Sequence, residues 1–141
     1  MQAPKLNREA KEELDRVRRN SLHSANRKID QRTEEVIGYW SQLGRDAISA
    51  RIRELDREWD VERFLELTAS TFALTGVLTG LKRGRATLVF SAIVLAFLFE
   101  HAVQGWCPPL PLFRLLGVRT RKEIDREKYA LKALRADSSR A

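Results

Sequence analysis

The chain has 141 residues, enough for one ordinary domain, with 26 Lys and Arg against 19 Asp and Glu and a formal net charge of +7. Its single cysteine, Cys107, excludes an intramolecular disulfide scaffold and any zinc site built on a Cys-x-x-Cys pair. Residues 64–106 contain only five charged side chains, although the flanks are rich in charge. Because a soluble helix needs a solvated face, this segregation predicts an all-α membrane protein, with charged amphipathic helices on either side of an apolar hairpin.

The part of the chain before the apolar centre is charged. Residues 1–25 have no regular apolar stripe, and we expect them to be disordered or weakly helical. Over residues 26–63 apolar side chains recur at steps of three and four, which indicates one charged amphipathic helix. Its stripe suits packing on the rest of the chain, a coiled coil or a membrane surface, although fewer than four clean heptads are present.

Residues 64–81 and 86–106 are two apolar segments, separated by the basic turn 82–85. As helices, 18 and 21 residues span about 27 and 32 Å, close to the roughly 30 Å hydrocarbon core of a bilayer. A four-residue link with a glycine suits two antiparallel helices. The sequence therefore predicts a two-helix transmembrane hairpin over residues 64–106, with the lipid bilayer as its partner.

The segment after the hairpin, residues 107–118, holds three of the four prolines. Proline cannot continue a helix, so the second apolar helix should end at or before Cys107. The segment remains apolar, and we therefore expect an interfacial loop that lies at the headgroups of the bilayer.

The last region, residues 119–141, is predicted to be a basic amphipathic helix with a tail. Thr120 and Glu123 form a capping box, which opens a helix over about residues 121–135. A helix of this kind beside a membrane is expected to lie on its surface, attracted by anionic lipid. Three residues give the helix a thin apolar stripe: Ile124, Leu131 and Leu134.

The first apolar segment carries small residues at steps of four, three and four. Small side chains let helix backbones approach closely in lipid, so this seam is predicted to be a packing surface. Its partner is either the second apolar helix of the same chain or the same seam of a second copy, and we expect a homo-oligomer. The seam consists of Ala69, Ala73, Gly76 and Gly80.

Glu66, Glu100 and His101 are the ionisable residues inside the two predicted spans, and they lie about equally far from the turn. We expect them to form an interfacial polar cluster near the face from which both ends of the hairpin emerge. Trp59 and Trp106 lie slightly further out, at the depth that tryptophan prefers. The flanks near the hairpin hold more basic residues than the turn, so the positive-inside rule predicts both termini in the cytoplasm.

His101 and Cys107 are the candidate base and nucleophile of the chain, and with Glu66 and Glu100 they are candidate metal ligands. Their spacing matches no standard zinc pattern, and Glu100 is adjacent to His101, so the two do not face each other on a helix. We therefore expect no enzyme, no metal site and no cofactor. Basic and acidic residues are interleaved in the flanks without a recognisable motif, and we expect no binding to nucleic acid.

Two short motifs flank the hairpin. Trp59-Asp60-Val61-Glu62-Arg63 precedes the first apolar helix, and Gly105-Trp106-Cys107-Pro108 ends the second, followed by Leu116-Gly117. Over about residues 55–118 the chain resembles the YgaP-like inner-membrane domain family of bacteria, whose function is unknown. The interval between the last two motifs is longer here than is usual in that family. Six motif residues carry the resemblance: Asp60, Glu62, Arg63, Gly105, Cys107 and Pro108.

The resemblance implies a two-helix, homodimeric module of the bacterial inner membrane, and it implies no reaction. The rhodanese domain of some family members has no counterpart in the short flanks. The first hypothesis for the function is an integral membrane protein with a structural or partner-binding role, whose protein partner is unidentified. The second is a soluble helical oligomer that buries the hairpin. The third is a membrane redox, metal or thiol protein that uses Cys107 and His101.

Overall fold

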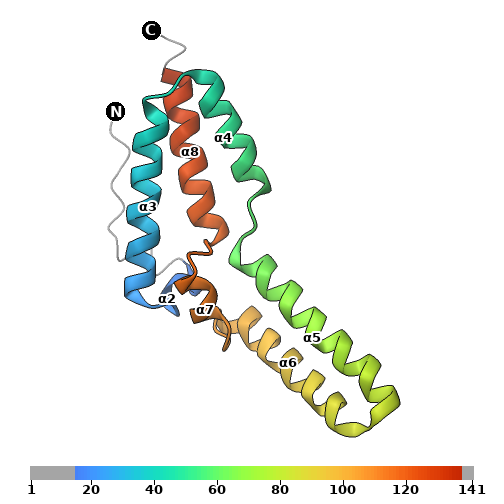
Figure 1. Cartoon of the computed structure of the whole chain (residues 1–141). Helices are drawn as coiled ribbons and strands as arrows, with labels where there is room; N and C mark the ends of the chain where they lie inside the picture. The colour runs from blue at the N-terminus through green and yellow to red at the C-terminus, as the bar shows by residue number, and fades with distance from the viewer. Residues whose placement is uncertain (1–14, 138–141) are drawn as a thin grey trace.

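The structure is a computed structural model that describes residues 15–137, and every regular element in this range is an α-helix. Three long helices pack into a head, and two others form a hairpin that extends from one end of it (Figure 1). Two short helices lie where the two parts meet (Figure 1). In chain order the helices are α2 (Arg16–Arg19), α3 (His23–Ser41), α4 (Arg45–Arg57), α5 (Val61–Arg83), α6 (Arg85–Gln104), α7 (Leu110–Leu115) and α8 (Arg121–Asp137).

The head is a bundle of α3, α4 and α8, in which α8 contacts both other helices (Figure 1). Its core joins Ile48, Ile52 and Leu55 of α4 to Ile124 and Leu131 of α8. The predicted apolar stripe of the C-terminal helix is therefore covered by protein. Its apolar face packs against α4, so this face is not free to meet lipid, whereas the position of the helix beside a membrane stays a prediction.

The single amphipathic helix predicted for residues 26–63 is wrong, because the structure has two helices there. The first ends at Ser41, and the second begins at Arg45 and runs back toward the hairpin (Figure 1). Gly44 is the N-cap residue of the second helix, and its backbone is extended, with a ψ of 165°. Apolar residues keep steps of three and four on both sides of the break, so their period did not reveal it.

Residues 1–25 are predicted to be disordered or weakly helical, and this is corrected for their last part, which holds α2 and the start of α3. Residues 1–14 lie outside the described residues. Asp15 caps α2, since its carboxylate accepts hydrogen bonds from the N–H groups of Val17 and Arg18 at 3.0 and 3.3 Å. Val17 is buried against the base of the hairpin. Contacts with residues far along the chain thus order a segment whose own sequence has almost no apolar stripe.

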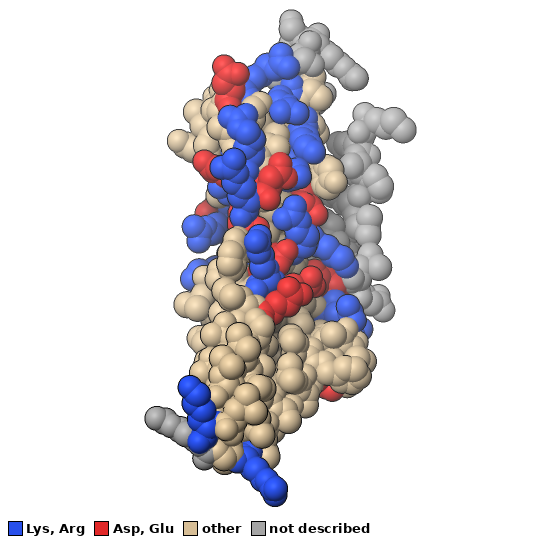
Figure 2. Space-filling model, turned by 90° about the vertical axis from the view of Figure 1, so that its right-hand side faces the viewer, with Lys and Arg blue, Asp and Glu red and all other residues tan. Residues whose placement is uncertain are grey.

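The hairpin helices α5 and α6 are joined by Gly84, whose φ of +118° is a conformation that other residues rarely adopt. The two helices occupy the predicted apolar segments. By length and composition, α6 and the stretch Arg45–Lys82, whose apolar part is α5, could each cross a membrane. Figure 2 shows charged side chains gathered over the head, and an almost uncharged surface between the head and the turn.

The segment 107–118, predicted to be a loop, contains the short helix α7. Leu110 at its start is buried in the junction between head and hairpin. Three other leucines of the segment are exposed: Leu112, Leu115 and Leu116. The segment is therefore partly helical, and its apolar character is divided between a buried face and an exposed one.

The predicted capping box at the start of α8 is confirmed. The N–H of Thr120 donates to a carboxylate oxygen of Glu123 at 2.8 Å, and the N–H of Glu123 donates to Oγ1 of Thr120 at 3.3 Å. The helix begins at Arg121, as the sequence indicates. Both residues are buried, so the box is part of the packed head.

Candidate functional site

The base of the hairpin is where the motif residues from both ends of the apolar region meet. Its buried cluster contains Val61 and Leu65 from α5, Cys107 and Leu110 from the segment after α6, and Val17 from α2. Residues more than 40 positions apart in the sequence therefore share one small core. This core fixes the hairpin on the head.

The first motif starts α5 and links it to the head. The carboxylate of Asp60 accepts a hydrogen bond from the N–H of Arg63 at 2.9 Å, which caps the helix. The N–H of Val61 donates to the carbonyl oxygen of Arg119 at 2.9 Å. The guanidinium of Arg63 lies 4.5 Å from the centre of the Trp59 ring. The motif thus has a structural role in the described chain: it begins one helix and connects it to the segment before α8.

The second motif ends α6 at Gly105, whose φ of +79° is left-handed. A Cβ at this position would lie 2.6 Å from Cβ of Arg16, so only glycine lets α2 approach. Arg16 donates to carbonyl oxygens of the last turn of α6, and Asn20 donates to the carbonyl of Gln104 at 2.8 Å. The N-terminal segment thereby supplies hydrogen-bond donors to the free carbonyl groups at the C-terminal end of α6. The sequence does not predict these contacts, because no local signal pairs residues so far apart.

Cys107 and His101 line different cavities in the structure. The thiol of Cys107 is buried in the junction core, and burial raises its pKa. With Pro108 it borders an apolar groove of about 470 Å³ along the hairpin. A reactive cysteine needs an accessible thiolate, which this environment disfavours. The two residues considered as a candidate nucleophile and base therefore do not border a common cavity.

The polar cluster predicted from Glu66, Glu100 and His101 is only partly brought together. Glu66 is exposed on α5, close enough to His101 to act on it electrostatically. His101 and Glu62 line a cavity of about 310 Å³ that is also bordered by α2 and the start of α8. Glu100 does not border this cavity. Within residues 15–137, no group of three or more His, Cys, Asp or Glu side chains could hold a metal ion.

The small-residue seam of α5 faces α6 of the same chain. A Cβ added at Gly76 would lie 2.2 Å from Oγ of Ser91, and one added at Gly80 would lie 2.7 Å from the side chain of Leu88. Oγ of Ser91 donates to the carbonyl oxygen of Ala73 at 3.0 Å. The fourth seam residue, Ala69, borders the apolar groove instead. Of the two partners considered for the seam, the helix of the same chain occupies it here.

A buried ion-pair network ties the junction to the head. Arg114 is 1% exposed and donates to both carboxylate oxygens of Glu123 at 2.7 Å, and to the side-chain oxygen of Asn26 at 2.7 Å. Arg18 also pairs with Glu123. Burial alone would raise the pKa of Glu123, but the hydrogen bonds and charge of Arg114 hold it below its usual value of 4.5. The sequence offered no signal for this network beyond the capping box.

Comparison of the chain with protein-family models gave no match, and comparisons with curated proteins and with solved structures gave none.

Proposed function

We propose that the chain is an integral membrane protein whose α5–α6 hairpin crosses a bilayer and holds the helical head at its surface. The exposure of the hairpin carries this proposal. In α6, Ser91 is the one buried residue, and large apolar side chains such as Val89, Phe90 and Phe99 are exposed. A soluble monomer rarely exposes a continuous apolar surface of this extent, because water makes it costly.

The dimensions of the hairpin support the same arrangement. Helices of 23 and 20 residues are about 35 and 30 Å long, which matches the hydrocarbon core. Trp59 and Trp106 are 39% and 41% exposed in the two links at the base of the hairpin, which suits an aromatic belt at one interface. Lys82 and Arg85 border the turn, where they would reach the headgroups on the other side.

The proposed location is the inner membrane of a bacterium, with the head and both termini in the cytoplasm. A hairpin returns the chain to the side from which it started, and basic residues are more numerous on the side of the head than at the turn. The resemblance to the YgaP-like family supports the same compartment. The role proposed for the head is structural or partner-binding, since the one thiol of the chain is packed in a core.

The seam of α5 restricts how the chain would form the proposed homo-oligomer. Gly76 and Gly80 are already in close contact with α6. A second copy would therefore meet a different face of the hairpin, unless the two helices separate first.

Alkaline carbonate extraction of membranes from cells that express the tagged full chain tests the proposal. Retention in the membrane pellet is expected for a hairpin that crosses the bilayer. Release into the supernatant would contradict it and favour the soluble oligomer that buries the hairpin. Fusions of a fluorescent protein and of alkaline phosphatase to the C-terminus test the orientation. With the C-terminus in the cytoplasm, the fluorescent protein should fluoresce and the phosphatase should be inactive. The opposite pattern would place the head outside the cytoplasm.

A further inference from the structure

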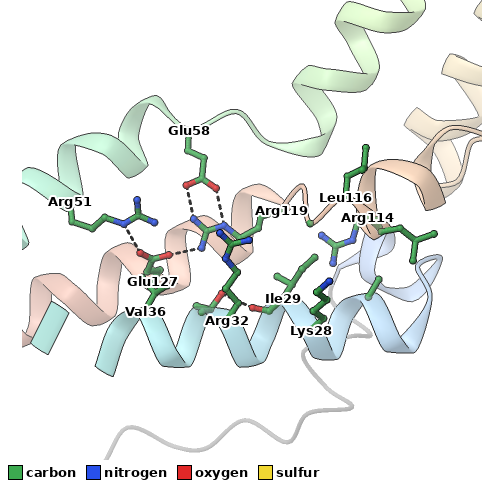
Figure 3. A pocket seen from close by; sticks show the side chains of 14 residues that line it. Lys28, Ile29, Arg32, Val36, Arg51, Glu58, Arg114, Leu116, Arg119 and Glu127 are labelled. Carbon is green, nitrogen blue, oxygen red and sulfur yellow. Dashed lines mark hydrogen bonds and ion pairs between the residues drawn. The ribbon is translucent and has the colours of Figure 1, made fainter. Parts of the chain in front are cut away.

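A second feature of the head is a cavity of about 360 Å³ with a cationic wall (Figure 3). Five basic side chains from four parts of the chain border it. Lys28 and Arg32 come from α3, Arg51 from α4, Arg114 from α7 and Arg119 from the segment before α8. No local motif unites these residues, and the fold alone brings them together.

The charges of the wall do not balance. Glu58 and Glu127 border the cavity and pair with Arg119 and Arg51, and Arg114 pairs with Glu123 behind the wall. The other two lining cations, Lys28 and Arg32, leave an excess of two positive charges. Arg119 pairs with both carboxylates, and Arg51 donates to Glu127 at 2.9 Å. These pairs fix that side of the wall, as Figure 3 shows.

The other side of the wall holds cations without a counter-charge. Lys28 and Arg32 make no ion pair with any residue in the range 15–137, and Figure 3 shows both on the face of α3 that borders the cavity. Arg114 adds an unpaired donor, because its buried Nε has no hydrogen-bond partner among the described residues. An unpaired buried donor in a packed protein calls for an explanation, and a bound anion is one.

The cavity also has an apolar border beside the hairpin. Leu115, Leu116 and Gly117 follow one another at the end of α7, and Leu116 is 71% exposed. Because α7 lies at the junction of head and hairpin (Figure 1), this apolar border belongs to the part of the head that is next to the proposed bilayer. Cations beside exposed leucines suit a phosphate group attached to an apolar chain.

We propose that this cavity binds a phosphate group, which Lys28 and Arg32 contact directly and Arg114 meets at the inner end. The source is the headgroup of an anionic lipid or free phosphate. The lipid source rests on the proposed membrane insertion, whereas the free anion does not. Lysine and arginine are the side chains that bind phosphate in proteins, through charge-assisted hydrogen bonds.

The test uses the purified full chain in a non-ionic detergent. Far-UV circular dichroism follows its thermal unfolding during titration with dioleoylphosphatidylglycerol, with dioleoylglycerol, which lacks phosphate, or with sodium phosphate. A ligand that binds only the folded chain raises the midpoint in proportion to its occupancy. The variant is Lys28→Gln with Arg32→Gln. The charge-matched control is Arg27→Gln with Arg53→Gln, two exposed residues that do not border the cavity.

A rise with phosphatidylglycerol alone supports the lipid source, and a rise with sodium phosphate as well supports free phosphate. In either case K28Q/R32Q should weaken the apparent affinity by about tenfold or more, while the control keeps it. No rise with either phosphate-bearing probe, an equal rise with dioleoylglycerol, or an unchanged affinity in K28Q/R32Q would overturn the proposal. Carbonate extraction tests membrane insertion separately. If the chain is retained in the membrane but binds no probe, the cavity proposal fails and the proposed membrane insertion stands.

Discussion

The helices α8 and α6 differ in where their apolar side chains lie: those of α8 are buried, and most of those of α6 are exposed. In α8, Ile124 and Leu131 are fully buried against α4, and the charged faces of the helix pair with its neighbours. In α6 most large apolar side chains point outward. Apolar surface must leave water in both cases. In the head, protein provides the apolar surroundings, and in the hairpin lipid is the surrounding that we propose.

The strongest way to test the head is to break its buried ion pair. Arg114→Ala leaves the carboxylate of Glu123 buried beside Arg18 alone, and removing one partner of such a pair costs about 3–5 kcal/mol. The free energy of unfolding of the head, measured by denaturant titration in detergent, should fall by that amount. Arg53→Ala, at an exposed residue of α4, should change it by less than about 0.5 kcal/mol. Equal effects of the two substitutions would refute the assigned role of Arg114.

The corresponding test of the hairpin acts on its packing. Gly76→Ala puts a methyl group where Oγ of Ser91 and the backbone of Thr87 already lie, and overpacking of this kind costs about 1–3 kcal/mol. We expect lower thermal stability of the hairpin in detergent. Gly38→Ala in α3 is the matched control, since a Cβ there meets nothing within 4 Å. It should stabilise the chain by about 0.5–1 kcal/mol. A stabilising Gly76→Ala would mean that α5 and α6 are not in close contact.

A smaller effect is expected at the start of α8. Thr120→Ala removes the hydroxyl that caps this helix and donates to Asp15 at 2.9 Å, which should cost about 1–2 kcal/mol. Thr120→Ser keeps the hydroxyl and should recover most of the loss. Chemical denaturation of the unchanged chain and of the two variants measures the loss and its recovery as free energies of unfolding. If serine is no better than alanine, the hydroxyl does not contribute and only the lost methyl group matters.

The smallest effect is a dependence of stability on pH, which is confined to acid pH. The pKa of Glu123 is lower in the folded chain than its usual value of 4.5, so its stabilising contribution is present above that value. This contribution is lost as the pH falls through the folded pKa, at no more than about 1.4 kcal/mol per pH unit. Unfolding midpoints measured from neutral to acid pH should fall less steeply for E123Q. Parallel curves for the two chains would show that Glu123 has no depressed pKa.

Features set by neighbouring residues could be predicted from the sequence. The two apolar helices and the glycine-containing turn follow from composition, and the capping box at Thr120 and Glu123 follows from a spacing of three. The break after Ser41 was missed, because two helices that share one core keep the same apolar period. Gly38 and Gly44 are the local signals of the break, since glycine disfavours a helix interior and Gly44 is the N-cap of α4.

The sites are less predictable than the helices, because their residues are far apart in the chain. Arg18 meets Glu123 across 105 positions, and Arg114 meets Asn26 across 88. The cationic cavity combines four segments in the same way. In the sequence these residues are only members of mixed-charge flanks, and their partners are set by how α3, α4 and α8 pack.

The most direct test of the contrast between head and hairpin places a spin label in each part of the full chain in lipid vesicles. In a Cys107→Ala background, Leu74→Cys labels the exposed face of α5 and Arg53→Cys labels the exposed face of α4. Electron paramagnetic resonance then measures collisions with oxygen, which concentrates in lipid, and with a water-soluble nickel complex. We expect the label on α5 to meet oxygen and not nickel, and the label on α4 to show the reverse. A label on α5 that meets nickel freely, or neither reagent, would contradict a hairpin surrounded by lipid.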